Sequence, residues 1–314
     1  MDHNNFFIST LNRKYGTKYS EFNELINQHK GFLEYIKDNI CSSDDKEIKN
    51  LERKNQNYSQ ILKSVLKFFK NLDTDIYNDV KRIFNRENDY VVIPMIHTGG
   101  KSSCGLDKTI FAAVNGNCLD TINFIHELTH GVGQRTKLSQ KPIDDCIGEI
   151  EGMFMDKISQ AYFHNNGYIS DQDYTSLQND RKRILKNNIS ILLSENQIFN
   201  MFPLPLSEKD FIDIQLSFIG KNERPQLIRR FWDMGKENTP TGKYYFRYIV
   251  GEVVSDLLYE KYLTDPEKTM EKFKNFLSKN AEINLFDATK MLLDKTPRKV
   301  MKDYINKFNE NENE

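Results

Sequence analysis

The sequence predicts a mainly α-helical fold with a small antiparallel β-sheet beside one helix that carries a metal-binding motif. Apolar residues recur at helical spacing over most of the chain, β-rich texture is confined to Tyr90–Asn115, and His126–His130 reads HELTH. With 314 residues, 38% hydrophobic and 12% aromatic, the chain can bury a sizeable core. We predict a helical N-terminal region at 1–88, a catalytic domain at 89–308 and a disordered acidic tail at 309–314.

The helices are expected in a regular order along the chain. Ser20 is a plausible N-cap for a helix through Ile40, and Ser42–Asp45 is a break. A polar stretch then leads into a second helix that ends near Phe69. The remaining helices are expected at Thr74–Phe84, Pro142–His164, Ser170–Leu193, Ser207–Ile219, Glu223–Met234, Gly242–Leu263, Pro266–Ser278, Leu285–Leu293 and Pro297–Phe308.

Two strands are expected immediately before the motif. Tyr90–Ile96 and Thr109–Asn115 are rich in β-branched and aromatic residues, and the glycine-rich stretch Gly99–Gly105 between them is expected to be a flexible connection. An Asn-Gly turn follows at Asn115-Gly116. The two strands are predicted to pair as a small antiparallel sheet that leads into the motif helix.

The central helix carries the pattern H-E-x-x-H. Asp120 or Thr121 is a good N-cap for it, and its apolar residues fall on one stripe. Residues four apart lie on one face of a helix, so His126 and His130 can direct two imidazoles at one metal ion. Glu127, beside the first of them, can take a proton from the water that attacks a substrate.

A third metal ligand is expected on the following helix, because a catalytic zinc usually has three protein ligands. Glu149 and Glu151 are two positions apart, about 200° around a helix, so they cannot both face the metal. We select Glu149. Asp144 and Asp145 are weaker candidates, because carboxylates are expected near a helix start in any case.

Further residues could support the metal ligands. Asp120 and Asp156 could accept hydrogen bonds from the two histidines, although Asp120 is equally suited to capping the helix. Gly148 and Gly152 would let the two helices pack closely.

Composition and charge narrow the class of protein. The net charge of −1 gives no electrostatic case for nucleic acid or an anionic membrane as partner, and no apolar run approaches the ~20 residues of a membrane span. The N-terminus lacks the pattern of a secretory signal. The four cysteines have no C-x-x-C spacing and are expected to be free thiols in a reducing cytoplasm.

Several motifs together resemble the thimet-oligopeptidase family of zinc peptidases, most closely its oligoendopeptidase F branch. That family has a strand and an Asn-Gly turn before H-E-x-G-H, as in Phe111–Thr121. Glu149–Asp156 resembles its motif E-[IV]-x-S-x-F-x-E, with Glu149 on the ligand position. Tyr244–Gly251 resembles its Y-x-Y-x-x-G helix, with Tyr248 on the second tyrosine. The similarity covers about residues 88–308.

The chain also departs from the family pattern. Thr129 replaces a glycine, Gly152 a serine, Asp156 a glutamate and Phe246 the first tyrosine of the helix. The family has a histidine shortly before these tyrosines, but this chain has none after His164. The chain is also much shorter than typical members.

The resemblance implies a zincin-type domain with helices on both sides of a substrate cleft, and one zinc ion per chain bound by His126, His130 and Glu149. It implies a zinc-dependent endopeptidase acting on peptides, with Glu127 as general base. Tyr245 and Tyr248 are three apart and share a helix face, so both could donate hydrogen bonds to the oxyanion, Tyr248 first.

A substrate peptide could add to an exposed edge of the strand Ile110–Val114. Two other classes of protein compete with an endopeptidase. One is a non-catalytic zinc-containing protein that binds peptides, and the missing histidine is its best support. The other is a helical interaction protein in which the motif is incidental.

Overall fold

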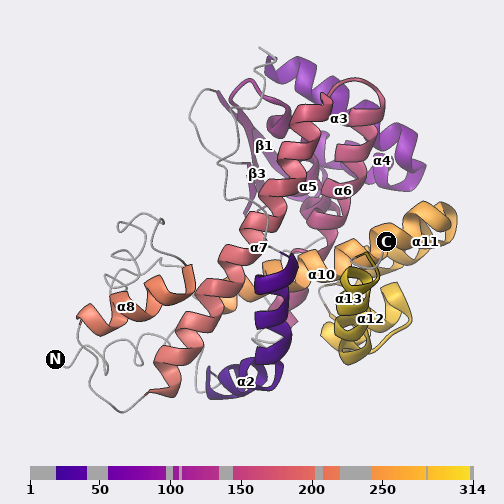
Figure 1. Ribbon diagram of the computed structural model, residues 1–314. Coiled ribbons are helices and arrows are strands. Elements are labelled where there is room, and N and C mark those ends of the chain that lie inside the picture. Colours follow the sequence, from indigo (N-terminus) through magenta and orange to yellow (C-terminus); the bar gives the residue numbers. More distant parts are fainter. Residues whose placement is uncertain are drawn as a thin grey trace. The chain divides into compact units, whose positions relative to one another are not determined.

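The computed structural model describes most of the chain (Figure 1). The described residues are 19–40, 56–96, 102–105, 108–133, 144–201, 208–219, 242–280 and 282–311. The chain divides into two compact units. The first unit contains Met1–Asp44, Arg181–Ile249 and Lys307–Glu314, and the second contains Asp45–Asp180 and Val250–Asn306. The boundaries at residues 88 and 308 stay predictions.

The fold class is as predicted: mainly helical, with one small sheet before the motif helix. The larger helices are α2 (Tyr19–Tyr35), α3 (Tyr58–Leu72), α4 (Thr74–Phe84), α5 (Cys118–Val132), α6 (Ile150–Asn165), α7 (Asp171–Asn200), α8 (Glu208–Ile219), α10 (Gly242–Thr264), α11 (Pro266–Lys279), α12 (Leu285–Leu293) and α13 (Pro297–Asn311). Short π- and 3₁₀-helical segments are η2 (Ile36–Ile40), η3 (Glu87–Asp89) and η4 (Asp144–Ile147). The helix predicted at Glu223–Met234 lies outside the described residues.

Several helices of the second unit begin at side-chain caps. Asn57 and Gln60 form a capping box at the start of α3. The Asp73 carboxylate accepts two backbone N–H groups at the start of α4. Such caps satisfy donors that have no partner within the helix, which explains why these helices begin where they do.

In the first unit, α2 packs against the C-terminal part of α7 through a cluster of asparagines. The Asn196 amide donates to Asn23 at 2.8 Å and to Asn27 at 3.1 Å, and the Asn200 amide donates to Asn27 at 2.9 Å. Asn23 and Asn196 are buried. Because buried amides need partners, this cluster favours one register between the two helices.

The core of the second unit surrounds α5, which contacts α3, α4, α6 and the sheet. Phe124, Ile125 and Leu128 of α5 are fully buried. The Tyr90 hydroxyl donates to the Gly131 carbonyl at 2.7 Å, and burial raises the pKa of this phenol to about 12. The helix that bears the two histidines is therefore held on several sides.

The sheet is mixed, and its predicted antiparallel pairing was wrong. Strands β1 (Val91–Ile96) and β3 (Thr109–Val114) run parallel, and β2 (Ser103–Cys104) pairs antiparallel with β3 on the other side. The stretch expected to be a flexible connection contains β2. Because the chain passes from β1 to the opposite edge before turning back into β3, β3 runs in the direction of β1.

This order corrects part of the prediction that a substrate peptide adds to an edge of Ile110–Val114. β3 has β1 on one side, and β2 pairs with Ile110 and Phe111 on the other, so these two residues are not at an exposed edge. For Ala112–Val114 the proposed edge stays a prediction. The Val91 N–H of β1 donates to the Lys108 carbonyl, on the side of β3. Backbone N–H groups alternate in direction along a strand, so the nitrogen of Pro94 faces the other side of β1, where proline offers no N–H donor. A proline on an edge opposes the addition of another strand.

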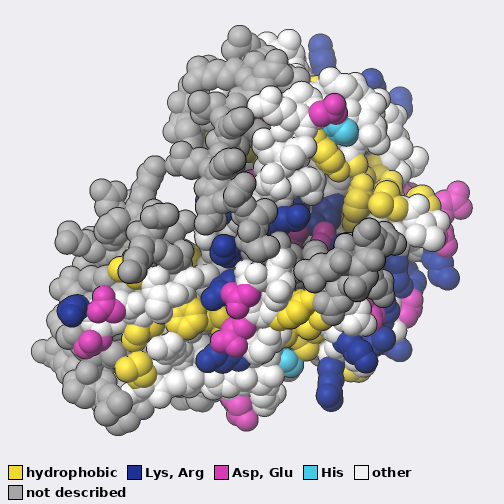
Figure 2. All heavy atoms as spheres, viewed as in Figure 1, with side chains coloured by type: hydrophobic (Ala, Val, Ile, Leu, Met, Phe, Trp, Pro, Cys, Tyr) yellow, Lys and Arg dark blue, Asp and Glu magenta, His cyan; other side chains and the backbone are white. Residues whose placement is uncertain are grey.

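The surface of the described residues is mixed in character. On the face drawn in Figure 2, basic, acidic and hydrophobic side chains are all present. Among the described helices, none is both long and apolar enough to cross a membrane. Cys104, Cys118 and Cys146 are free thiols, as predicted, and Cys41 lies outside the described residues.

Candidate metal centre

The motif helix α5 begins earlier than predicted, with Asn117 as its N-cap. Asn117 accepts the Leu119 N–H at 3.0 Å and forms a capping box with Asp120. The Asp120 carboxylate accepts the backbone N–H groups of residues 115–117, so it closes the Asn-Gly turn. Gly116 in this turn has a φ of 87°, which favours glycine. Asp120 is therefore a capping residue and does not orient a histidine.

His126 and His130 lie on one face of α5, as their spacing predicts. Their Nε2 atoms are 3.0 Å apart, and both side chains are largely buried. Between them, the buried Thr129 hydroxyl donates to the Ile125 carbonyl at 2.8 Å, so threonine is accommodated without an unpaired polar group.

Glu149 lies just before α6, because the helix predicted from Pro142 onward is interrupted. η4 ends at Ile147, and α6 begins at Ile150 with Glu149 as its N-cap, at φ −111° and ψ 0°. Glu149 therefore departs from the regular helical rotation. Of the two glutamates, Glu149 belongs to the group that could hold a metal ion, whereas Glu151 contacts the outer ring nitrogen of His130.

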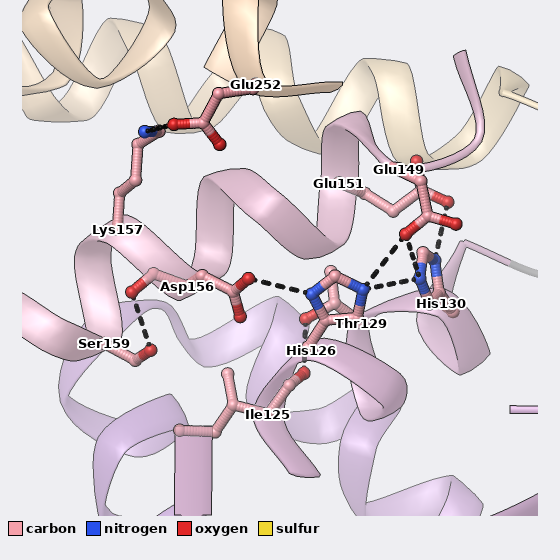
Figure 3. A network of polar contacts seen from close by, with 10 residues as sticks. All are labelled: Ile125, His126, Thr129, His130, Glu149, Glu151, Asp156, Lys157, Ser159 and Glu252. Atoms are coloured by element: carbon pink, nitrogen blue, oxygen red, sulfur yellow. Dashed lines mark hydrogen bonds and ion pairs between the residues drawn. The ribbon is translucent and has the colours of Figure 1, made fainter. Parts of the chain in front are cut away.

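His126, His130 and Glu149 form a group that could hold a metal ion (Figure 3). Glu149 Oε2 is 3.3 Å from His126 Nε2 and 3.6 Å from His130 Nε2. Ligand atoms about 2.0–2.1 Å from a tetrahedral zinc lie about 3.3 Å from one another. The three donor-to-donor distances bracket that value, so two neutral imidazoles and a carboxylate fit a zinc ion here.

The outer ring nitrogens of the two histidines each contact a carboxylate of α6. Asp156 Oδ2 is 3.0 Å from His126 Nδ1, as predicted, and Glu151 Oε1 is 3.1 Å from His130 Nδ1. Sequence reasoning missed the contact of Glu151. The sequence gives one indication of it: Glu151 lies between the apolar Ile150 and the small Gly152, which favours a packed position over a fully solvated one.

Two glycines allow the close packing around this group. A Cβ atom added to Gly152 would lie 2.4 Å from the His126 ring. On α10, a Cβ atom added to Gly251 would lie 2.9 Å from Glu149 Cβ and 2.7 Å from Met153 Sδ. Gly152 therefore allows α5 and α6 to approach, as predicted, and Gly251 allows α10 to lie against the carboxylate residue.

The carboxylates around the histidines change their proton affinity in the metal-free chain. Burial lowers the pKa of His130, but hydrogen bonds with Glu149 and Glu151 outweigh this effect and raise the pKa to about 9. Burial also lowers the pKa of His126, and the charge of Asp156 outweighs it, so that this pKa lies well above its usual value. The group is thus built to hold positive charge.

Three further residues were predicted to be catalytic: Glu127, Tyr245 and Tyr248. Glu127 is partly exposed on α5, and among the described residues it forms no hydrogen bond or ion pair. Tyr245 and Tyr248 are partly buried and belong to the first compact unit. The Arg247 guanidinium donates to the Tyr248 hydroxyl at 3.3 Å. The roles of these three residues stay predictions.

Comparison with known proteins supports the fold. No protein-family model and no curated protein matches the chain. Two crystal structures do match. The first is a Bacillus anthracis str. Ames protein assigned as an oligoendopeptidase F, with a TM-score of 0.55, 12% identity, and coverage of 92% of this chain and 55% of that one. The chain has an oligoendopeptidase F-like fold.

The second matching structure is a Chlamydophila abortus protein assigned as a peptidase. The TM-score is 0.56 at 16% identity, with coverage of 93% of this chain and 54% of that one. The chain therefore spans about half the length of each protein. The resemblance inferred from the motifs is confirmed at the level of the fold.

Proposed function

We propose that this chain is a zinc-dependent endopeptidase that hydrolyses peptides. The main support is the group formed by His126, His130 and Glu149, whose ligand atoms lie at distances that suit one zinc ion. The oligoendopeptidase F-like fold supports the same function. Zinc bound there would act as a Lewis acid that polarises the peptide carbonyl and lowers the pKa of water to about 7.

The chain's own residues would carry the proton transfers. The Glu127 carboxylate adjoins a proposed ligand and is partly exposed, so it can accept a proton from the attacking water. It would then deliver that proton to the leaving amine. The phenol of Tyr248, and second that of Tyr245, would donate hydrogen bonds to the developing oxyanion.

The test is digestion of a mixed peptide library with the zinc-loaded chain, repeated with a chelator and after zinc is restored. Cleavage that disappears with the chelator and returns with zinc supports the proposal. Glu127→Gln is the matched variant: it should keep zinc and the fold but lose roughly 10²–10⁴-fold of the activity. Undiminished turnover in the folded, zinc-loaded variant would remove Glu127 from the mechanism, and no cleavage by the zinc-loaded wild type would overturn the function.

A further inference from the structure

Glu151 is the most deeply buried acidic side chain at the metal centre. Its side chain has 0% exposure, whereas that of Asp156, its counterpart at the other histidine, is 16% exposed. Glu151 lies in the first turn of α6, and its Oε1 atom faces His130 Nδ1 at 3.1 Å. It is not part of the group that could hold the metal, because it lies on the outer side of the imidazole (Figure 3).

A carboxylate at this depth requires compensation. Removing an ionised carboxyl group from water costs several kcal/mol unless charged or polar partners replace the solvent. The imidazole N–H of His130 is one such partner. Glu151 also lies in the first turn of α6, where the unpaired backbone N–H groups of a helix start give a partial positive charge that favours an acidic side chain. The position is therefore suited to a permanent acceptor beside His130.

We propose that Glu151 is a positioning residue that orients His130 for the metal. By accepting the hydrogen bond of Nδ1–H, it would select the tautomer in which Nε2 is free to bind zinc, fix the plane of the ring and increase the basicity of the ligand. Asp156 makes the same contact with His126. In this arrangement α5 supplies both imidazoles, while Glu149 and the two orienting carboxylates precede or lie on α6.

Zinc affinity, measured by competition with a chromophoric chelator, tests this role without reference to catalysis. Loss of such an orienting partner typically weakens metal binding 10–100-fold, and we expect this loss for Glu151→Ala. Glu151→Gln keeps an oxygen that can accept the same hydrogen bond, so its affinity should be closer to wild type. The absorption spectrum of the cobalt-substituted protein should change in Glu151→Ala and be largely restored in Glu151→Gln.

Asp120→Ala is the matched control for removing a buried carboxylate. Asp120 is 2% exposed and lies on the same helix as the histidines, but its hydrogen bonds go to residues 115–117. This variant should lose thermal stability and keep the zinc affinity of the wild type. Asp156→Ala should behave like Glu151→Ala, because it removes the acceptor of the other imidazole.

A measurement on the wild type keeps the proposal testable should Glu151→Ala not fold. In ¹⁵N-histidine-labelled, zinc-loaded protein, the Nδ1 of His130 should carry the proton. A proton on Nε2, or a folded Glu151→Ala protein with wild-type zinc affinity, would overturn the proposal. The inference rests on the proposed zinc site: a wild type that binds no zinc overturns both, whereas one that binds zinc without cleaving peptides overturns only the peptidase activity.

Discussion

At the scale of single residues, Gly152 beside the candidate metal centre leaves no space for a larger side chain. Gly152→Ala would place a Cβ atom 2.4 Å from the His126 ring, between two packed helices. We expect weaker zinc binding and a destabilisation of about 1–3 kcal/mol, because overpacking displaces the neighbouring side chain. Chelator competition and denaturant unfolding measure the two effects. Gly31→Ala is the control, since its Cβ would meet nothing within 4 Å on α2; equal losses in both variants would contradict the packing argument.

The second prediction at this scale concerns Tyr248. A phenol has a reference pKa of about 10, so at pH 7 it can donate a hydrogen bond without adding charge. Arg247 donates to its oxygen at 3.3 Å, and a phenolic hydroxyl can act as a donor as well as an acceptor. Tyr248→Phe should lower kcat about 10²–10³-fold with little change in KM or zinc content, and Tyr245→Phe the same or less. Steady-state kinetics on one peptide decide this: near-normal kcat in both variants would remove the tyrosines from the mechanism.

Protonation of the histidines gives a third prediction. Since the pKa of His130 in the metal-free chain is raised to about 9, zinc must displace a proton at neutral pH. Apparent zinc affinity should therefore rise steeply between pH 6 and pH 8, by up to about tenfold per pH unit for each proton displaced. Titrations of zinc against a competitor of known pH dependence would show this, and a flat profile would contradict it.

The raised pKa of His130 also makes the stability of the metal-free fold depend on pH, in the direction opposite to that of zinc affinity. A group whose pKa is higher in the folded than in the unfolded chain stabilises the fold below its unfolded pKa, which is about 6.5 for histidine. That contribution is lost as pH rises from about 6.5 through about 9. Stability from His130 should thus decline with pH where zinc affinity increases.

Much of the candidate metal centre could be predicted from residue spacing alone. His126 and His130 meet because four residues make about one helical turn, and a carboxylate was expected on the next helix. The position of Glu151 was not predictable in this way. It depends on the turn at residues 148–149, which delays the start of α6, and a helical wheel drawn through that turn gives the wrong rotation.

At the scale of elements, a buried cluster of charges joins α6 to α10. The Lys157 ammonium donates to Glu252 at 2.8 Å and also contacts Asp256, and the Lys157 side chain is 5% exposed. Lys157→Met would remove the buried cation that both carboxylates contact. We expect a loss of about 3–5 kcal/mol in the free energy of unfolding.

The control for this variant is Lys274→Met. Lys274 also bridges two carboxylates, Asp73 and Asp75, but it lies closer to solvent, where ion pairs contribute about 0–1 kcal/mol. Denaturant unfolding at saturating zinc compares the two. Equal losses would show that burial does not decide the contribution of Lys157.

Elements differ in how well the sequence predicts them. α4 and α12 match the predicted ranges because strong caps and helical spacing agree at both. The pairing of the sheet was predicted wrongly because β2 was not foreseen. This strand is only two residues long, too short to show any periodicity, and it lies in a glycine-rich stretch. Its place at the edge decides the direction of β3, so one unseen strand reversed the predicted pairing.

At the scale of the whole molecule, the two compact units should respond differently to zinc. The three proposed ligands, the orienting carboxylates, and the helices α5 and α6 all belong to the second unit. A ligand that binds only the folded state stabilises it by about 2.7 kcal/mol at 100 times its Kd. Zinc would contact only the second unit, so its binding free energy should stabilise that unit. The slowest-exchanging amides of the second unit should therefore gain most of the protection from hydrogen exchange.

Hydrogen exchange read by mass spectrometry tests this prediction. Zinc removal should accelerate exchange in peptides from α5, α6 and the sheet, and change peptides from α2 and from residues 181–200 of α7 much less. The mutant His130→Ala, which lacks one proposed ligand, should show little response to zinc in either unit and so exclude non-specific binding. Equal acceleration throughout the wild-type chain would mean that the units unfold as one cooperative body, because binding energy delivered to one unit would then protect both.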